Sequence, residues 1–418
     1  MKVDLKYSGL SLNEICSREN QRQISEIHSL LHSNDKSSGT TWIDYPENYD
    51  KKELTKILKL AKTIEQNSNV LLVVGIGGSY LGARAGIEFL QPKGKVEIIF
   101  AGTSFDYEDL AQKLEYIKNK DVTVNIVSKS GTTVEILSTL SIVEKFMKNK
   151  YKTNYKSRII FTTDKNKGYL RQKANLEGFE ALSVPDYMGG RYSVLSAVGL
   201  LPFACAEINI KKILEGALDA QKELSTPDLN KNTAYQYAVY RNIIPKKYNR
   251  KIEMFSCFNT RLSSFGGWLQ QLFAESEGKK GKGLFVCNQT FSTDLHSVGQ
   301  FLQQGSPIFA ETFLLIENQY KDATLSNIPL DSPVKFLDGK TFSHLNKCAY
   351  EGTLKAHNDA DIPIVSISIN EADEYNYGYL TYFFELACAA SGYLLGINPF
   401  DQPGVEQYKS YMKELLNK

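Results

Sequence analysis

Short apolar runs alternate with amphipathic segments through the first half of the chain, and this alternation limits the possible folds most strongly. Residues 70–74 (VLLVV) are continuously apolar, which is typical of a strand buried on both faces of a sheet. Four alternations of strand and helix predict a doubly wound parallel sheet with right-handed crossovers. The predicted strands are 70–74, 96–100, 122–127 and 158–162, and the predicted helices are 51–66, 81–90, 108–118, 134–146 and 168–176.

The second half has a similar alternation, which predicts a second α/β unit. Its strand-like runs are 252–257, 284–287, 309–316 and 364–369, and its helical stretches include 194–206, most of 210–245, 375–395 and 405–416. We therefore expect four parts: an N-terminal arm (1–48), a first α/β domain (49–185), a second α/β domain (186–400) and a C-terminal helix (401–418). The two halves share too little sequence identity to indicate an internal repeat.

Composition argues against several classes of protein. The 418 residues include 49 basic and 47 acidic side chains, and the net charge of +2 gives no electrostatic case for nucleic acid or a membrane surface. The N-terminus lacks the apolar core of a signal peptide, and the most apolar long stretch, 375–397, contains Glu385 and five tyrosines. That stretch is typical of a buried helix. The six scattered cysteines indicate free thiols in a reducing compartment, so we expect a cytoplasmic protein.

A hydroxyl-rich loop between the third strand and its helix predicts an anion site. This hydroxyl loop (residues 128–133) reads SKSGTT, with four hydroxyls and one ammonium. Free N–H groups and the dipole of the following helix would attract an anion to the same place. A capping role explains one threonine but not the whole run, so the loop favours a phosphate monoester.

A second loop, the glycine loop (residues 75–79, GIGGS), follows the first strand. It resembles a dinucleotide fingerprint only weakly, because Tyr80 replaces the third glycine and no acid follows the next strand. The chain also lacks a P-loop sequence. A tight strand-to-helix turn is the simplest alternative reading. Since parallel strands end at one edge of the sheet, however, we expect both loops to face one cleft.

Three further residues could supply proton-transfer chemistry. Glu275 lies one helical turn beyond Gln271 and just before the helix-breaking Gly278, although a glutamate at a helix end is usually only solvated. His296 begins an amphipathic helix without other metal ligands at suitable spacing, so zinc is not expected. Arg191 follows two glycines. Together with the hydroxyl loop, these residues are typical of proton transfer on a phosphorylated carbonyl compound.

Six segments in fixed order resemble the signatures of the glucose-6-phosphate isomerase family. They are GIGGSYLGARA, SKSGTT, GGRYSVLSAVGLLP, ESEGK, DLHSVGQFLQQG and FDQPGVEQYK, and they extend from about residue 70 to residue 413. The chain is most similar to the shorter, bacterial form. It has Glu277 and Pro403 where animal members have asparagine and tryptophan, which affects neighbours of the chemical groups rather than the groups themselves.

The resemblance implies two subdomains of the sugar-isomerase (SIS) type with helical N- and C-terminal arms, and interconversion of glucose 6-phosphate and fructose 6-phosphate through a cis-enediol(ate). It implies that Glu275 is the base, Arg191 stabilises the enediolate, and His296 with Lys409 assists ring opening. It also implies a homodimer in which the histidine-bearing helix reaches the neighbouring subunit's site, and no cofactor or metal. The implied substrate-binding residues are Gly78, Ser79, Ser128, Lys129, Ser130, Thr133, Gln271 and Gln402.

Two other classes remain as alternatives. A sugar-phosphate sensor of the SIS type should lack Glu275, His296 or Arg191, and all three are present. An amidotransferase that builds glucosamine 6-phosphate would need a glutaminase domain with an N-terminal cysteine, whereas this chain starts MKVDLK. We therefore expect an isomerase.

Overall fold

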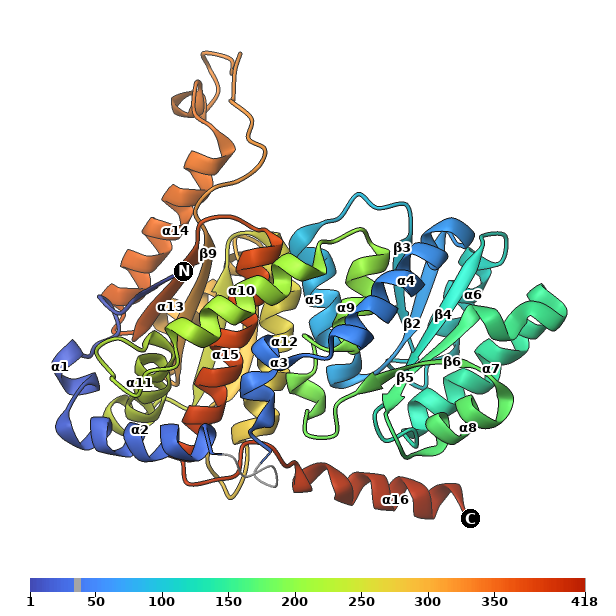
Figure 1. The fold of residues 1–418 in the computed structure, drawn as a ribbon. Coiled ribbons are helices and arrows are strands. Elements are labelled where there is room, and N and C mark those ends of the chain that lie inside the picture. Colours follow the sequence, from blue (N-terminus) through green and yellow to red (C-terminus); the bar gives the residue numbers. More distant parts are fainter. Residues whose placement is uncertain (34–38, 418) are drawn as a thin grey trace.

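The computed structural model describes residues 1–33 and 39–417, which form two five-stranded sheets with helices packed on them (Figure 1). The first sheet is parallel throughout and has the order β3-β2-β4-β5-β6. The four predicted strands are confirmed, and the short fifth strand was not predicted because it mixes polar and apolar residues. Their bounds are β2 Val70–Val74, β3 Glu97–Ala101, β4 Val122–Val127, β5 Ile159–Asp164 and β6 Glu180–Val184.

Helices cover both faces of the first sheet, as a doubly wound fold requires. Alternate strand residues enter two separate hydrophobic cores because successive side chains of a strand point to opposite faces. One core contains side chains from α4 (Lys51–Asn67), α5 (Leu81–Leu90) and α9 (Ala197–Cys205). The other contains side chains from α6 (Tyr107–Ile117), α7 (Val134–Tyr151) and α8 (Tyr169–Glu177).

The second sheet has the order β1-β10-β9-β7-β8, and its four long strands are parallel. The start of the N-terminal arm contributes an edge strand that runs antiparallel to β10, which the sequence pattern did not predict. Three residues are too few to produce a recognisable alternation. The bounds are β1 Lys2–Asp4, β7 Ile252–Cys257, β8 Phe285–Thr290, β9 Phe309–Ile316 and β10 Ile364–Ile369.

A long buried helix, α15 (Glu374–Leu394), lies at the centre of the second half and packs against α10, α11, α12 and α2. The buried helix expected at 375–395 is thus confirmed. Within residues 1–33 and 39–417, no helix has the length and apolar character needed to cross a bilayer. The remaining helices are α1 Leu12–Ile15, α2 Arg18–Leu31, α3 Tyr45–Asn48, α10 Ile210–Glu223, α11 Thr233–Tyr248, α12 Ser263–Glu277, α13 Leu295–Gln304, α14 Phe342–Asp359 and α16 Glu406–Leu416.

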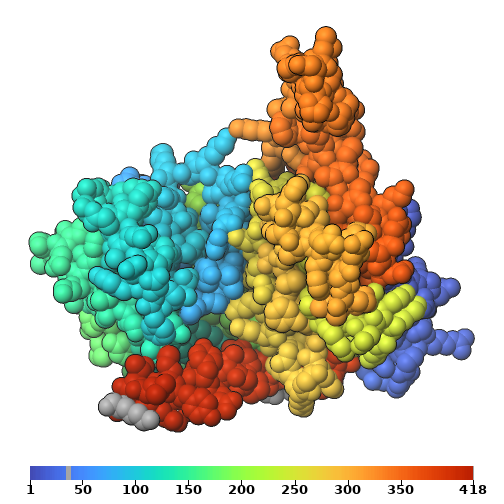
Figure 2. All heavy atoms as spheres, turned by 180° about the vertical axis from the view of Figure 1, so that it is seen from behind, coloured from blue at the N-terminus to red at the C-terminus, as the bar shows by residue number. Residues whose placement is uncertain are grey.

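Two segments extend away from the sheets. The projecting segment (residues 317–341) and the start of α14 rise above the second half in both views (Figures 1 and 2). The C-terminal helix α16 lies along the opposite side, under the first half, and none of its side chains is buried. All six cysteines, which belong to the described part of the chain, are free thiols.

Candidate active site

The two loops singled out in the sequence flank the point where the strand order of the first sheet reverses. The chain runs from β2 outward to β3 and then returns past β2 to β4, so the carboxyl ends of β2 and β4 border a crevice. Ligands of open α/β sheets bind in crevices of this kind. The glycine loop follows β2, and the hydroxyl loop follows β4.

Hydrogen bonds within the hydroxyl loop fold it around its own hydroxyls. Ser128 Oγ lies 3.0 Å from Thr133 Oγ1 and accepts a hydrogen bond from the Gly131 amide at 3.2 Å. Thr133 occupies the N-cap position of α7, yet its side chain caps none of the first amides of the helix. The capping alternative is therefore wrong for Thr133, and the positive end of α7 opens beside the exposed hydroxyl of Ser130.

Lys129 joins the hydroxyl loop to the segment that precedes Arg191. Its ammonium donates hydrogen bonds to the backbone oxygens of Asp186 at 2.6 Å and Met188 at 3.0 Å. An ammonium has three donors, so one remains for a ligand. Burial of the side chain lowers the pKa of Lys129, and the nearby acids Asp164 and Asp186 counteract this effect.

The glycine loop packs against the loop that carries Arg191. A Cβ atom on Gly78 would lie 2.3 Å from the backbone oxygen of Gly190, so this contact requires glycine. Gly77 has a positive φ of 56° and faces the amide of Gln271 on α12. Ser79 is half-buried at the end of the same turn, in the 3₁₀ helix Gly77–Ser79. The glycines therefore bring the crevice, Arg191 and α12 together.

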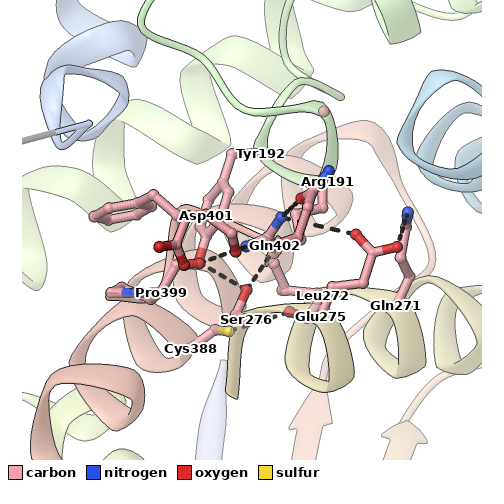
Figure 3. Close-up of polar contacts among 12 residues, drawn as sticks. Arg191, Tyr192, Gln271, Leu272, Glu275, Ser276, Cys388, Pro399, Asp401 and Gln402 are labelled. Carbon is pink, nitrogen blue, oxygen red and sulfur yellow. Dashed lines mark hydrogen bonds and ion pairs between the residues drawn. The ribbon is translucent and has the colours of Figure 1, made fainter. Parts of the chain in front are cut away.

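Arg191 is buried and almost fully hydrogen-bonded (Figure 3). Its Nε donates to Ser276 Oγ at 2.7 Å, and its second terminal nitrogen donates to the backbone oxygens of Pro399 at 2.5 Å and Asp401 at 3.1 Å. The first terminal nitrogen donates to Gln402 Oε1. Because these bonds fix the guanidinium plane, its charge is held in one orientation.

Glu275 projects from the last turn of α12 toward this guanidinium (Figure 3). Its Oε2 lies 3.7 Å from the Arg191 guanidinium, and its Oε1 accepts a hydrogen bond from Gln271 Nε2 at 3.3 Å. The carboxylate is held by these two contacts and is not merely solvated. The Glu275 side chain is 34% exposed, so it remains accessible to a ligand. The predicted shared face of Gln271 and Glu275 is confirmed.

Lys409 lies on α16 and approaches the first half. It donates a hydrogen bond to Glu406 at 2.8 Å, which raises the pKa of Lys409, and Glu135 in the first turn of α7 adds a smaller effect. Lys409 thus lies near the helix start that follows the hydroxyl loop. The C-terminal segment supplies Gln402 as well, which accepts a hydrogen bond from Arg191.

Within residues 1–33 and 39–417, His296 makes no polar side-chain contact that would join it to this cluster. It is exposed near the start of α13, and in the described residues its side chain makes no hydrogen bond or ion pair with another predicted site residue. The expectation that Lys409 lies beside His296 stays a prediction.

Two negative findings concern the described residues alone. Residues 1–33 and 39–417 contain no cluster of three or more His, Cys, Asp or Glu side chains that could hold a metal. A cavity of about 830 Å³ lies at the carboxyl ends of β7, β9 and β10. None of the predicted site residues lines it.

Sequence reasoning missed Ser276, although it lies between Glu275 and Glu277 in the ESEGK segment. Its buried hydroxyl accepts the Arg191 Nε–H and lies 3.4 Å from the Tyr192 hydroxyl. Its place in this motif, next to Glu275, was the sequence signal that could have identified it. The backbone oxygens of Pro399 and Asp401 leave no such trace, because any residue provides a carbonyl.

A family model described as phosphoglucose isomerase matches residues 60–418. The chain belongs to the phosphoglucose isomerase family. Curated relatives in this family include the glucose-6-phosphate isomerases of Clostridium tetani, 45% identical over 94% of this chain and 91% of theirs, and of Caldanaerobacter subterraneus, 46% identical over 94% and 90%.

Two solved structures have the same fold as this chain. A hypothetical protein from Thermus thermophilus superposes with a TM-score of 0.92 at 27% identity over the whole of both chains. A glucose-6-phosphate isomerase from Chlamydia trachomatis superposes with a TM-score of 0.84 at 19% identity, over 99% of this chain and 88% of that one. The latter identity establishes a shared fold. The predicted fold class, with two SIS-type units, is confirmed.

Proposed function

We propose that this protein catalyses the isomerisation of its family, the interconversion of D-glucose 6-phosphate and D-fructose 6-phosphate, with Glu275 as the base. The reaction belongs to glycolysis and gluconeogenesis. Family membership supports the reaction, since the curated relatives are glucose-6-phosphate isomerases. The observation that carries the residue assignment is the accessible carboxylate of Glu275, held 3.7 Å from a buried arginine beside the glycine loop.

In this proposal the first half binds the phosphate of the sugar. The hydroxyls of Ser79, Ser128, Ser130 and Thr133, the ammonium of Lys129 and the open amides of α7 supply donors to a dianion. Hydrogen bonds of this kind, between charged donors and phosphate, are the strong ones. Gly78, Gln271 and Gln402 then border the sugar, since they contact the loop of Arg191, Glu275 and Arg191 respectively.

The chemical step is a proton transfer between C2 and C1. A C–H bond beside a carbonyl becomes acidic enough for a carboxylate base only if the enediolate oxygens are stabilised as their charge develops. The fixed guanidinium of Arg191 suits this role because its orientation requires no rearrangement during the reaction. Glu275 removes the proton from one carbon and returns it to the other, so the base is regenerated.

Ring opening requires a group that exchanges a proton with the ring oxygen, and we assign it to His296 assisted by Lys409. His296 is exposed on α13, and the family resemblance implies that this helix reaches a neighbouring subunit's site, so the proposal includes a homodimer in which α13 enters the partner's crevice. The exposed surface around His296 supports such an interface, because Phe301 on α13 is 47% exposed and Phe285 at the sheet edge is 63% exposed.

Mixing two inactive variants tests the shared site. In a mixed dimer of Glu275→Gln and His296→Ala, one of the two sites would contain both intact residues. After random subunit exchange we expect about a quarter of the wild-type activity, because half of the dimers are mixed and each has one intact site. Two variants that stay inactive together, although native mass spectrometry shows mixed dimers, would contradict the shared site. Each variant mixed with wild type serves as the control.

A coupled assay tests the reaction itself. We expect isomerisation of glucose 6-phosphate, weaker or no turnover of mannose 6-phosphate, and full activity in EDTA, because Arg191 and the hydroxyl loop supply the electrostatic stabilisation in this mechanism. Binding of fructose 6-phosphate without any turnover would favour a sensor instead. Turnover that needs glutamine would favour an amidotransferase. The proposal includes a cytoplasmic location, as expected from the free thiols.

A further inference from the structure

The last turn of α12 carries three consecutive side chains with different surroundings. Glu275 faces the crevice, whereas Ser276 and Glu277 are buried. Ser276 accepts a hydrogen bond from Arg191, as Figure 3 shows. Glu277 contacts a second buried arginine, Arg241, on the opposite side of the turn: its Oε2 lies 2.7 Å from an Arg241 terminal nitrogen. The turn that presents the base is therefore held between two guanidinium groups.

Arg241 is fixed from several directions. It comes from α11, its side chain is 1% exposed, and its guanidinium carbon lies 3.9 Å from the centre of the Phe273 ring, on α12 itself. It also forms an ion pair with Glu253 on β7. Glu253 in turn accepts hydrogen bonds from Thr312 Oγ1 at 2.8 Å and from the Tyr237 hydroxyl. Arg241 thus connects the central strands of the second sheet to the end of α12.

The buried charges around Arg241 do not balance one to one. Two carboxylates share one guanidinium in the protein interior, and Glu253 has two further donors whereas Glu277 has Arg241 as its hydrogen-bonding partner. Burial works against the charged guanidinium, but Glu277, with smaller effects of Tyr237 and Cys388, raises the pKa of Arg241. A buried pair is weak support for stability as such, because apolar residues of similar volume often stabilise a core as well. Its location suggests a geometric role instead.

We propose that Arg241 and Glu277 are a positioning pair that fixes the last turn of α12 and, through it, the carboxylate of Glu275. The inference rests on the proposed role of Glu275 as the base. The final turn of a helix is where backbone hydrogen bonds are incomplete and ends fray, and Gly278 follows immediately. A side-chain contact from the interior, opposite Arg191, removes that freedom.

The pair should affect turnover rather than substrate binding. A displacement of about 1 Å in a catalytic group can cost on the order of 100-fold in rate. The phosphate donors lie on other elements, after β2 and β4, and none of them contacts Glu277 or Arg241. Loss of the pair should therefore lower kcat and leave KM nearly unchanged. A general loss of stability would instead reduce the number of folded sites and leave kcat per folded site unchanged.

Two substitutions of Glu277 test the proposal in the full-length enzyme. Glu277→Ala removes the contact, and we expect kcat to fall by about 10-fold to 100-fold with KM within about twofold of wild type. Glu277→Gln keeps an oxygen that accepts from Arg241 and leaves Glu253 to balance the charge. We expect the Gln variant to keep kcat within about threefold of wild type. If Glu277→Ala does not fold, Glu277→Asp withdraws the carboxylate and replaces it in the comparison.

A second buried glutamate contact provides the matched control. His357 Nδ1 lies 2.7 Å from Glu311 Oε2, both side chains are buried, and the pair joins α14 to β9 away from α12. Glu311→Ala should lower the melting temperature while kcat per folded site stays within about twofold of wild type. An unchanged kcat in Glu277→Ala, or an equal loss in the Ala and Gln variants, would overturn the positioning role.

The same experiment separates this inference from the assignment of the base. Glu275→Gln is measured beside the Glu277 variants. If Glu275→Gln keeps its activity, the proposed base is wrong whatever Glu277 does. If Glu275→Gln is inactive while Glu277→Ala turns over at the wild-type rate, the base stands and the positioning pair is wrong. Solvent deuterium exchange at C2, measured in parallel, should fall with kcat in Glu277→Ala.

Discussion

The two sheets share a strand order but are used differently. When their parallel strands are numbered in chain order, both begin 2-1-3-4, so each has a point where the order reverses. In the first sheet the hydroxyl loop leads from β4 directly into α7 at that point. In the second, β9 leads into the projecting segment, and α14 begins only at Phe342. The start of the helix after the third strand, which favours an anion, thus lies at the reversal point of the first sheet and is displaced from that of the second.

The difference teaches that topology provides a crevice and side chains decide its use. The reversal point of the second sheet borders a cavity of about 830 Å³, but acids such as Asp373 and bases such as Arg261 line it together. The second half contributes in another way. Its helix α12 presents Glu275 at the crevice of the first half, so in the proposed mechanism one half binds the phosphate and the other supplies the base.

The largest expected effect follows from changing Arg191, which joins the two halves. Arg191→Lys keeps a positive charge but cannot reach Ser276, Pro399 and Gln402 together. We expect kcat to fall by about 10²–10³-fold, as for loss of an oxyanion donor, with a smaller change in KM. Steady-state kinetics in both directions measure this. A change confined to KM would mean that Arg191 binds substrate without stabilising the enediolate.

Next in size is the effect of Lys129, which tests the division between binding and chemistry. Lys129→Met removes a charged donor to the phosphate, and we expect KM to rise by about 10-fold to 100-fold. The matched control is Lys321→Met, an exposed lysine at the reversal point of the second sheet, which should leave both constants within about twofold. Equal effects of the two substitutions would contradict the proposal that the phosphate binds at the first sheet and not at the second.

A smaller effect is expected from the glycine loop. Gly78→Ala places a methyl group 2.3 Å from the Gly190 oxygen, and we expect about 1–3 kcal/mol of destabilisation because the Arg191 loop must shift. Gly190→Ala is the control on the other side of the same contact, since a Cβ there meets no atom within 4 Å. Thermal unfolding of both variants decides the point. Equal stability of the two would show that the contact does not require glycine.

The smallest effect concerns pH. Burial lowers the pKa of Lys129, so its ammonium loses its proton at a lower pH than an exposed lysine does. If Lys129 binds the phosphate as proposed, its contribution is complete below that pKa and is lost as the pH rises through it. We expect kcat/KM to fall on the alkaline side below pH 10.5, and Lys129→Arg to move that fall upward. An alkaline limb that does not move would assign it to another group.

Much of the fold could be predicted because it depends on local patterns. Continuous apolar runs identified the parallel strands, and helical periodicity identified helices such as α5 to the residue. The antiparallel strand β1 could not be found this way, since its three residues gain their structure from β10. The sequence also did not reveal that the two halves share a strand order. Strand order depends on packing, and unrelated apolar residues can satisfy the same packing equally well.

The site was predictable where a motif names a side chain. Residues 128–133, Arg191 and Glu275 were found from their sequence context, and the structure brings Arg191, Glu275, Gln271 and Gln402 together. Arg241 could not be found, because it lies in no motif and gains its role from contacts with Glu253 and Glu277. The place of His296 in the site follows only from the proposed dimer, which a pattern within one chain cannot describe.

The most direct test of the central claim measures binding and proton transfer in one variant. In Glu275→Gln the phosphate-binding half is untouched, so fructose 6-phosphate should bind with an affinity within about threefold of wild type by calorimetry. Exchange of the substrate C2 proton with solvent deuterium should be lost, by at least about 10²–10⁴-fold. Retained binding with lost exchange is the predicted result. Undiminished exchange would contradict the assignment of Glu275 as the base.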